Sequence, residues 1–464
     1  MVEYDSYKSS SYDWLGKIPS HWGEKFLEQT ASEKCVKNID NTVTQVLSLS
    51  YGEIKKKNDL NKGLIAQDLS TYQIIEPGDI IMRLTDLQND HKSLRTGLVK
   101  DDGIITAAYL CLVPRISSEY LHYLLHSYDV QKVFYGMGGG VRQSIGFKDI
   151  RHMYVPVPPR AEQDQIVRFL DWKVSEINKL IEIRRKEIQE LEALKSAVIT
   201  TAITKGIDPS AAMKKTDVYY LPDVPAAWKV TKLKRICKVG ASINEQLKKH
   251  DDQDEVVFLP MENISEDGQI DCSIKQPIAK VKTGFSSFAK DDVIVAKITP
   301  CFENGKGACL DKLESDIGYG TTELFNLRAG DDVLPEYLYF ITMTKLFRIL
   351  GEGQMTGSAG QKRVPADFIR NFTIGLPALD EQQAIVEYIH AEKERIDRLI
   401  ATKHEQLSAL TEFKSTVISD TVTGKIDIRN VTVPEYEHVD DISDDDSEGD
   451  EESDETETEM DEEV

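Results

Sequence analysis

Cysteine is scarce in this chain: 464 residues include six, at positions 35, 111, 237, 272, 301 and 309. No two of them form a Cys-x-x-Cys pair, which argues against a zinc site or a redox motif. We interpret the nearest two, Cys301 and Cys309, as small thiols of the core or of a loop in preference to metal ligands. The cysteine usage predicts no disulfide framework and a reducing, cytoplasmic setting.

Long apolar runs are also missing. No stretch approaches the roughly 18 apolar residues that a membrane helix needs. The polar start MVEYDSYKSSSYDW does not have the form of a signal peptide. We therefore expect no membrane association. The hydrophobic fraction of 40% and the length of 464 residues leave room for two or three domains with substantial cores.

A basic excess is absent too. The formal net charge is −23, but residues 435–464 carry 18 Asp and Glu and no Lys or Arg, so residues 1–434 hold 56 basic and 61 acidic side chains. That balance neither argues for a nucleic-acid partner nor excludes one. The acidic run predicts a disordered tail. It is either a solubilising or salt-adapted tail, or a mimic of DNA charge that competes for basic grooves until DNA displaces it.

Catalytic motifs are likewise lacking. The sequence has no Asn-Pro-Pro-aromatic run of a methyltransferase, no P-loop of a motor and no nuclease-like group of carboxylates with lysine. The run GMGGG (136–140) lacks the Gly-x-Gly-x-x-Gly spacing of a nucleotide site. His122 and His126 have a metal-ligand spacing but no third ligand nearby. We therefore expect no catalytic residue, no cofactor and no metal on this chain.

What the sequence does contain is a long internal duplication. Residues 150–208 and 369–427 align without a gap at an offset of 219, with 18 identities in 59 positions. Earlier phrases match as well: IPSHW (18–22) with VPAAW (224–228), GDIIMRLT (78–85) with DDVIVAKIT (291–299), and EYL (119–121) with EYL (336–338). This period is too long for a solenoid and indicates two copies of a whole domain with a connecting element.

Each half has the same order of predicted elements. A mixed region comes first, with short strands at Ile80–Leu84 and Val293–Ile298 and one short helix near Ser118–Ser127 and Pro335–Lys345. A proline-marked exit follows, because proline ends a strand's ladder and is tolerated at the start of a helix. Long helices are then predicted at about Ala161–Ile203 and Asp380–Val422.

Both long helices carry apolar residues at spacings of three, four and seven, which is typical of a coiled coil. The expected seam consists of Ile177, Leu180, Arg184, Leu191, Leu194 and Val198 in the first helix and Ile396, Leu399, Lys403, Leu410, Phe413 and Val417 in the second. A helix of 43 residues would be about 64 Å long. One domain cannot cover that length, which favours the sister helix as partner over packing on the helix's own domain. Arg184 and Lys403 would help to set the register.

The short connection after the first helix favours an antiparallel pair. The predicted fold class is α+β: two tandem mixed α/β domains separated by two long helices that form an antiparallel coiled coil, with approximate two-fold symmetry. The expected boundaries are 1–158 for the first domain, 159–208 for the first helix, 209–377 for the second domain, 378–428 for the second helix and 429–464 for a disordered acidic tail.

Two variable mixed regions that alternate with two similar long helices resemble the specificity subunit of type I restriction–modification enzymes. The phrases that carry the likeness are the two Pro-x-x-Trp entries, VIVAKITPCFENGKGACL (293–310), GSAGQKRVPADFIRNFTIGLPALDEQQAIV (357–386) and FKSTVISDTVTGKIDI (413–428). The likeness covers roughly residues 12–428. The first copy departs from the pattern at the loop GMGGGVRQSIGFKDI (136–150).

The resemblance implies that each mixed domain is a target-recognition domain that binds one half of a split site in double-stranded DNA. It implies that the helices fix the spacer and dock two methyltransferase subunits, with motor–nuclease subunits joining for cleavage. Those partners would use S-adenosylmethionine, ATP and Mg, whereas this chain would be the non-catalytic part of an adenine-specific methyltransferase and ATP-dependent endonuclease. Such a pseudo-symmetric protein matches pseudo-symmetric half-sites at a fixed separation.

If the domains bind DNA, Lys and Arg should contact phosphates, and some Arg, Lys, Asn and Gln should reach base edges. The candidates are Lys55, Lys56, Lys57, Lys92, Arg95, Arg142, Gln143 and Lys148 in the first domain and Lys248, Lys249, Lys297, Lys306, Gln361, Lys362 and Arg363 in the second. The five in the matching glycine-rich loops are favoured (Arg142, Gln143, Gln361, Lys362, Arg363), because glycine permits close backbone approach. The alternative for each is an ordinary solvated side chain.

Two other functions remain open from the residues alone. One is a protein–protein scaffold built on a duplicated coiled-coil domain, and the other is a catalytic subunit with an unrecognised site. Neither predicts sequence-selective protection of DNA, or adenine methylation, at a two-part site with a fixed gap.

Overall fold

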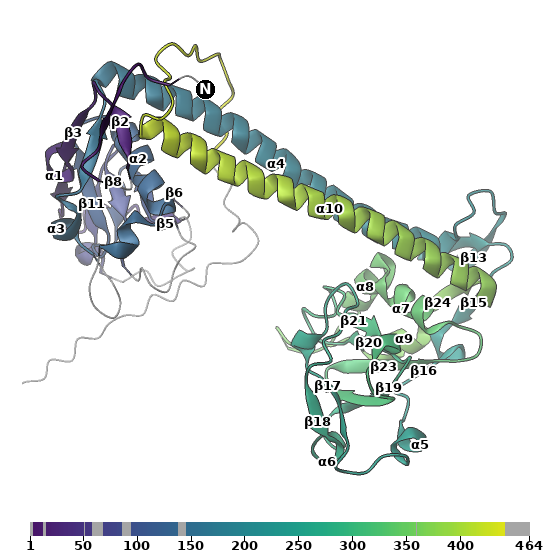
Figure 1. The fold of residues 1–464 in the computed structure, drawn as a ribbon. Coiled ribbons are helices and arrows are strands. Elements are labelled where there is room, and N and C mark those ends of the chain that lie inside the picture. The colour runs from purple at the N-terminus through teal and green to yellow at the C-terminus, as the bar shows by residue number, and fades with distance from the viewer. Residues whose placement is uncertain are drawn as a thin grey trace, which may run out of the picture. The chain divides into compact units, whose positions relative to one another are not determined.

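The computed structural model describes residues 3–12, 15–50, 52–57, 68–85, 94–137, 145–358 and 360–440. The chain divides into two compact units, one of Met1–Arg185 with Glu405–Val464 and the other of Lys186–His404. Two long helices, α4 (Arg160–Lys205) and α10 (Leu379–Val422), contribute to both units (Figure 1). Each unit therefore contains one α/β domain and about half of each long helix. The predicted helix bounds are confirmed to within two residues.

The first domain precedes α4. Its strands are β1 (Tyr7–Ser9), β2 (Lys17–Pro19), β3 (Gly23–Phe26), β4 (Ala31–Lys34), β5 (Leu47–Ser50), β6 (Glu53–Lys56), β7 (Gln73–Ile75), β8 (Ile80–Met82), β9 (Thr96–Leu98), β10 (Gly103–Ile105), β11 (Leu110–Pro114) and β12 (Tyr154–Val157). Its helices are α1 (Leu27–Thr30), α2 (Ser118–Val130) and α3 (Phe147–Ile150), with 3-10 turns at Leu69–Thr71 and Val133–Gly136. The main sheet is antiparallel, in the order β4-β11-β8-β9, and the other strands pair in twos.

The second domain lies between α4 and α10 in the chain. Its strands are β13 (Met213–Val218), β14 (Leu221–Pro225), β15 (Lys229–Lys232), β16 (Cys237–Val239), β17 (Glu255–Leu259), β18 (Lys275–Pro277), β19 (Ser286–Ala289), β20 (Val293–Ala296), β21 (Gly307–Cys309), β22 (Ile317–Gly320), β23 (Leu324–Ala329) and β24 (Thr373–Leu376). Its helices are α5 (Asn244–Leu247), α6 (Ile278–Val281), α7 (Pro335–Met343), α8 (Lys345–Glu352) and α9 (Ala366–Asn371), with 3-10 turns at Leu233–Arg235, Met261–Asn263 and Leu310–Lys312.

The two domains share the topology of the main sheet and of two smaller ladders. The antiparallel sheet β16-β23-β20-β21 repeats β4-β11-β8-β9, the ladder β15-β24 repeats β3-β12, and β13-β14 repeats β1-β2. The second domain also has a mixed sheet, β18-β17-β22-β19, in which β17 and β22 are parallel. Strands β8 and β20 are buried along their whole length because both faces of the sheet are covered, and their apolar runs were the strands predicted from the sequence.

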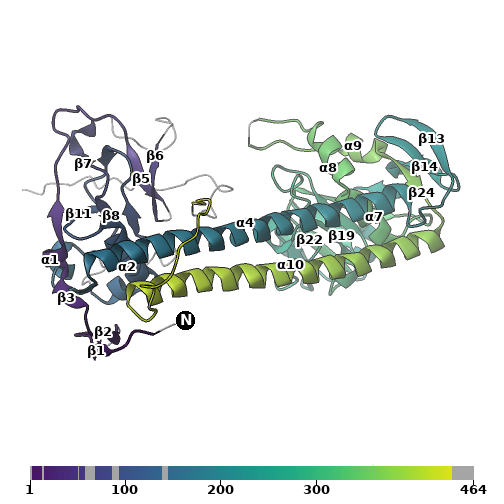
Figure 2. The same ribbon diagram turned by 90° about the horizontal axis from the view of Figure 1, so that it is seen from above.

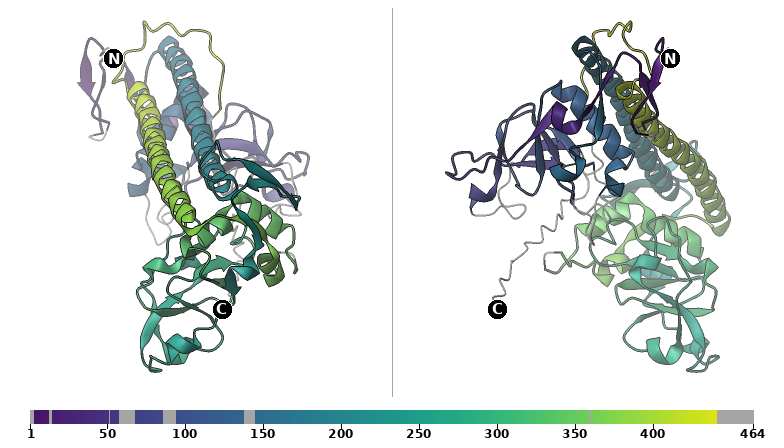
Figure 3. Two further views of the ribbon diagram at one scale, coloured as in Figure 1. Left: turned by 90° about the vertical axis from the view of Figure 1, so that its right-hand side faces the viewer. Right: turned by 60° about the vertical axis from the view of Figure 1, so that its left-hand side comes forward.

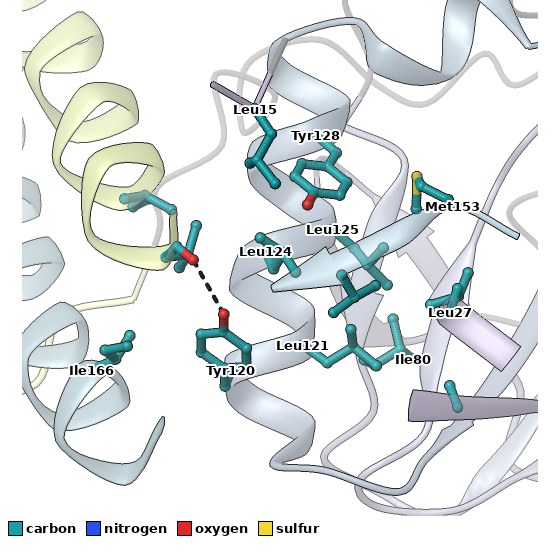
Figure 4. Packing of buried hydrophobic residues seen from close by; sticks show 14 of the residues in the cluster. Leu15, Leu27, Ile80, Tyr120, Leu121, Leu124, Leu125, Tyr128, Met153 and Ile166 are labelled. Carbon is teal, nitrogen blue, oxygen red and sulfur yellow. Dashed lines mark hydrogen bonds between the residues drawn. The ribbon is translucent and has the colours of Figure 1, made fainter. Parts of the chain in front are cut away.

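The core of the first unit joins the domain to the long helices. Helix α2 buries one face at helical spacing, comprising Tyr120, Leu121, Leu124, Leu125 and Tyr128 (Figure 4). Side chains of α4 and α10 complete this core: Ile166, Leu170, Val417, Ile418 and Val422. All six cysteines are free. In the described part of the chain, no helix is long and apolar enough to cross a membrane.

Helices α4 and α10 pack side by side and antiparallel (Figures 2 and 3). In the first unit, Lys414 Nζ donates to Asn178 Oδ1 at 3.3 Å. In the second unit, Lys195 Nζ lies 2.8 Å from Asp397 Oδ1. These two contacts are one contact repeated, because Lys195 aligns with Lys414 and Asn178 with Asp397 in the duplication. The predicted antiparallel pairing of the helices is confirmed in each unit.

The seam between the helices differs from the predicted one. Ile177, Ile181 and Ile188 are buried on α4, as are Ile396 and Val417 on α10. Four residues assigned to the seam, Leu180, Leu194, Leu399 and Phe413, are instead 42–49% exposed, so the prediction is wrong for them. The remaining assigned residues, Arg184, Leu191, Val198, Lys403 and Leu410, are half-buried.

The physical reason is a choice between two helical spacings. Ile177 is followed by the adjacent pair Leu180-Ile181, so a step of three or of four both reach an apolar residue, and the packed helix uses the step of four. Lys403, one of the two predicted register residues, lies 3.0 Å from Glu187 of the facing helix. An ion pair between two packed helices favours one alignment of the helices and so helps to set their register.

The chain beyond α10 is not disordered up to residue 440, contrary to the prediction. Residues 428–440, here named the C-terminal strap, lie along α4. Gln165 Nε2 donates to the carbonyl oxygens of Ile428 (3.2 Å) and Val431 (2.7 Å), and Asn178 Nδ2 donates to that of Val439 (3.1 Å). The acidic run begins only at residue 435, and both Val431 and Val433 pack against the core. The average composition of the tail conceals these two apolar residues. Residues 441–464 lie outside the described residues.

Candidate nucleic-acid interface

Trp22, from the first Pro-x-x-Trp phrase, fastens the first domain to the start of α4. Its Nε1 donates to Glu162 Oε1 at 2.9 Å, and the Tyr4 hydroxyl donates to the same oxygen at 2.6 Å. His21 Nε2 lies 2.8 Å from the other carboxylate oxygen, Oε2. Burial and the Glu162 carboxylate raise the pKa of Tyr4 above its ordinary value, so the phenol remains a donor.

Tyr120 of the EYL phrase fastens the same domain to the end of α10. Its hydroxyl lies 2.8 Å from the Pro156 carbonyl and 3.1 Å from that of Val422, and Figure 4 shows the phenol pointing from α2 toward the last turn of α10. Gly424 follows that turn with φ +75°, and a Cβ there would lie 2.3 Å from Pro19. Only glycine permits this close approach.

The second unit repeats the tryptophan and tyrosine contacts. Trp228 Nε1 donates to Glu381 Oε1 at 2.9 Å, and the Tyr337 hydroxyl donates to the Ile203 carbonyl at 3.4 Å. Gly206, with φ +76°, packs its Cα against Trp228. We call each set of contacts a clasp. The clasp holds one domain on the start of one long helix and the end of the other, which explains why these phrases recur in the sequence.

A loop at residues 353–365, between α8 and α9, carries the favoured candidates of the second domain; we call it the glycine loop (Figure 2). Backbone bonds tie it to the segment after β20. Thr299 N donates to the Lys362 carbonyl at 3.0 Å and Val364 N to that of Lys297 at 2.9 Å. Gly357 has φ +132°, in the region that glycine adopts without strain. The loop therefore has a defined position beside the end of β20.

Arg363 is held by a carboxylate at this place. Its Nε and Nη2 donate to the two oxygens of Glu323 at 2.9 Å each, a bidentate pair. The guanidinium lowers the pKa of Glu323 below its usual range. Arg363 thus fixes the loop to the strand side of the domain, and its charge is offset before any partner arrives.

Three other candidates surround this pair. Gln361 and Lys362 are exposed in the glycine loop, and Lys297 Nζ lies 5.4 Å from the centre of the Phe325 ring. The structure thus brings an amide and cations to one place, and in general amides can contact base edges and cations can contact phosphates. The structure brings together four of the seven candidates of this domain, Lys297, Gln361, Lys362 and Arg363.

The other three are placed differently. Lys306 Nζ donates to the Met261 carbonyl at 3.2 Å and so supports the domain's own backbone. Lys248 and Lys249 follow α5, which lies at the end of the domain opposite α8 (Figure 1). Lys248 is exposed and pairs with Glu245 at 2.8 Å.

Arg95, a candidate of the first domain, is corrected by the structure: its side chain is fully buried. Nη1 donates to the carbonyls of Thr85 (2.7 Å) and Arg83 (3.2 Å), and Nε donates to the Tyr135 hydroxyl (3.2 Å). A guanidinium buried in this way cannot contact a phosphate. It holds the segment that follows β8.

Arg348 on α8 plays the matching part in the second unit, and sequence reasoning missed it. Its Nη1 and Nη2 donate to the carbonyls of Phe302 (2.8 Å) and Gly305 (3.2 Å), in the segment after β20. Burial lowers its pKa to about 10, which leaves it charged at neutral pH. A single Arg on a helix gives no sequence signal of burial, so only packing reveals it.

The remaining candidates of the first domain are lysines near the surface. Lys55 and Lys56 stand on β6, where Lys56 pairs with Asp101 at 2.9 Å and Lys55 lies 3.7 Å from Glu53. Lys57 follows them, half-buried, and Lys148 is exposed on α3. Lys92, Arg142 and Gln143 lie outside the described residues. Within the described ranges, no group of three or more His, Cys, Asp or Glu is placed to hold a metal ion.

Comparison with known proteins finds one family. The model described as the type I restriction modification DNA specificity domain matches residues 99–193 and 225–409, together more than half of the chain. The two matched segments contain the tyrosine and the glutamate of each clasp, Tyr120 with Glu162 and Tyr337 with Glu381.

Individual relatives agree with this match. The chain is 44% identical over 167 residues to the type I restriction enzyme EcoAI specificity subunit of Escherichia coli, a match that covers 35% of this chain and 28% of that protein. It is 23% identical over 434 residues to the putative MjaX specificity subunit of Methanocaldococcus jannaschii, covering 89% and 96% of the two chains. The matched part thus spans less than a third of the length of the EcoAI subunit.

A solved structure has the same fold. Its title names complex assembly and conformational transition of the type I R-M system, and one of its chains superposes with a TM-score of 0.62 at 15% identity. The superposition covers 88% of this chain and 99% of that one.

Proposed function

Because the chain belongs to the type I restriction modification DNA specificity family, we propose that it selects the DNA sequence in a type I restriction–modification complex. Each domain binds one half of a bipartite site in double-stranded DNA. The helix pair sets the gap between the halves and docks two methyltransferase subunits, and motor–nuclease subunits join for cleavage. The chain is non-catalytic, acts in the cytoplasm and leaves S-adenosylmethionine, ATP and Mg to its partners.

The observation that carries this proposal is where the two copies agree and where they differ. The clasps and the Lys195 and Lys414 contacts recur pair for pair. The loops in front of the last strand differ: GMGGGVRQSIGF in the first copy and GSAGQKRVPADF in the second. An assembly surface requires sameness, and two different half-sites require different contacts with base edges.

Mapping of methylated adenines tests the proposal. The chain is expressed with its methyltransferase partner in a host that lacks other adenine methylation, and the modified positions are sequenced. We expect a two-part motif with a gap of constant length. Methylation without such a motif, or none in the presence of an active partner, would contradict the proposal and favour a scaffold or an unrecognised enzyme.

The exposed apolar side chains of the helices support the docking of two partners. In the first unit, the Asn178–Lys414 contact places Leu180 level with Phe413. In the second unit, the Lys195–Asp397 contact places Leu194 level with Leu399. The duplication exchanges these pairs, because Leu180 aligns with Leu399 and Leu194 with Phe413. Two equivalent apolar patches suit two copies of one subunit.

Native mass spectrometry tests that assignment. A variant with Leu180→Asp and Phe413→Asp should bind one methyltransferase subunit where the parent binds two, and adding Leu194→Asp and Leu399→Asp should abolish binding. A variant of Phe285, exposed in the second domain and on neither long helix, serves as the control (Phe285→Asp). Retention of two subunits by the fourfold variant would exclude this surface as the docking site for the methyltransferase subunits.

The spacer role has its own test. Seven residues inserted into both helices, at matching levels of the seam, preserve the heptad register and add about 10.5 Å. At 3.4 Å per base pair, the gap should grow by about three base pairs. An unchanged gap in the methylation motif would show that the helices do not set the spacing between the half-sites.

A further inference from the structure

The two clasps are equivalent, but the surfaces beside them are not. In the first unit the C-terminal strap turns back from α10 and follows α4 from Gln165 to Asn178. Val431 and Val433 of the strap pack on the core of that unit. Phe169 of α4 and Ile426 belong to the same core and are 8% and 7% exposed.

The same positions are uncovered in the second unit. Tyr388 aligns with Phe169 and Ile207 with Ile426, and both are 40% exposed. The cause is the path of the chain, because after α4 it leaves directly for β13 instead of turning back along α10. On α10, the face that corresponds to the strap-covered face of α4 therefore has no covering segment among the described residues.

A hollow marks this place. Its volume is about 730 Å³, and its lining includes Leu194, Val198 and Met213 together with Ile207 and Tyr388. All belong to the second unit. Side chains along the adjoining face of α10 are small, since Ala384 and Ala391 stand where the first unit has Gln165 and Trp172.

The strap indicates what chemistry such a face accepts. It presents β-branched residues first and carboxylates later, and Glu437 and Asp440 lie 3.9 Å and 3.7 Å from Lys179 and Lys100. On α10, Arg398 stands at the position of Lys179 and is exposed. An apolar hollow is thus followed by a cation in the same order as in the first unit.

We propose that the hollow and the adjoining face of α10 receive an extended segment of a partner protein, in which β-branched residues are followed by carboxylates. The strap covers the equivalent face in the first unit, so a partner finds this surface open on the second unit alone. The inference goes beyond DNA recognition and does not rest on it. It concerns an asymmetric docking site for a polypeptide.

A peptide of residues 426–440, labelled at its amino end, is the probe, and the full chain is the receptor. We expect saturable binding in fluorescence anisotropy. Tyr388→Asp should weaken it by about tenfold, because a carboxylate would lie where an apolar contact forms. Arg398→Glu should weaken it by about threefold at low salt and less at high salt. Ile183→Asp, an equally exposed change on α4 of the other unit, should leave it unchanged.

Cross-linking locates the site independently. A photoreactive residue in place of the peptide's Tyr436 should attach to residues 384–398, as identified by mass spectrometry. Several outcomes would overturn the proposal: no binding, equal binding by Tyr388→Asp, or attachment to α4 of the first unit in exchange with the strap. A dimer that forms with concentration and disappears on removal of residues 429–464 would assign the hollow to a second copy of the chain and would also overturn it.

Discussion

At the scale of single residues, the carboxylate at the start of α4 does more than its counterpart on α10. Glu162 Oε1 accepts from two buried donors, Trp22 and Tyr4, whereas Glu381 Oε1 accepts from Trp228. A buried donor left without an acceptor costs about 1–3 kcal/mol. His21 also lies 2.8 Å from Glu162 Oε2, so the duplication supplies an internal comparison for the worth of the Tyr4 and His21 contacts together.

We expect Glu162→Ala to lower the free energy of unfolding by about 3–5 kcal/mol and Glu381→Ala by about 1–3 kcal/mol. Urea titrations followed by tryptophan fluorescence measure the two losses, and hydrogen exchange assigns each loss to its unit. Equal losses for the two variants would show that the Tyr4 and His21 contacts contribute nothing.

Glu323 sets how much positive charge the glycine loop presents. Its pair with Arg363 is half-exposed, so the pair contributes little to stability, but it offsets one cation at the proposed interface. Glu323→Gln should therefore raise affinity for non-specific duplex DNA several-fold and steepen the dependence of log K on log salt by about one. Glu245→Gln makes the same charge change on α5, beside Lys248, and should alter neither the DNA affinity nor its salt dependence. An equal effect of the two variants would indicate general electrostatics instead of a local contact.

At the scale of elements, adjacent residues of α4 distinguish the seam from the partner-facing side. Ile181 is 7% exposed and Leu180 is 44% exposed. Ile181→Asp buries a charge between the helices and should cost about 3–5 kcal/mol. Leu180→Asp should change stability by less than about 0.5 kcal/mol while weakening the docking of a methyltransferase subunit. Thermal unfolding and subunit binding are measured on both variants. Ile181→Asp should lower the stability more than Leu180→Asp does, whereas Leu180→Asp should leave stability nearly unchanged and weaken subunit binding.

The helices were the part of the fold best predicted from sequence, because their heptads extend over many turns and average out single errors. The seam could not be fixed in the same way, because Leu180 and Ile181 are both apolar and only packing chooses between them. The two central strands were recognised as continuous apolar runs. The mixed sheet β18-β17-β22-β19 was not foreseen, because its strands are short and lie far apart in the chain.

The candidate site was likewise predictable from the sequence only in part. Glycine-rich composition identified the loop that holds Gln361 and Lys362, since glycine marks backbone that other residues cannot form. Sequence did not separate Arg95 from the surface cations. The residue type is arginine whether the guanidinium is buried and binds carbonyls or is exposed and binds phosphate. The carboxylate partner of Arg363 is 40 positions away in the chain, and no local pattern connects them.

At the scale of the whole molecule, the acidic tail is tied to one unit. The C-terminal strap ends with Asp440 at 3.7 Å from Lys100 of the first domain. Residues 441–464, which follow Asp440 in the chain, carry most of the acidic side chains of the tail. A tethered polyanion has a high effective concentration near its anchor and competes with DNA phosphate for the same lysines.

Truncation after Asp440 removes this charge and keeps the strap. We expect affinity for duplex DNA to rise about fivefold at low salt, with the difference vanishing at high salt, because screening and counterion release act on both competitors. A chain whose residues 441–464 are replaced by a neutral Gly-Ser segment of equal length should behave like the truncation, which separates charge from bulk. Unchanged affinity at low salt in both variants would rule out competition and leave the tail a solubilising role, to be measured as the salt dependence of solubility.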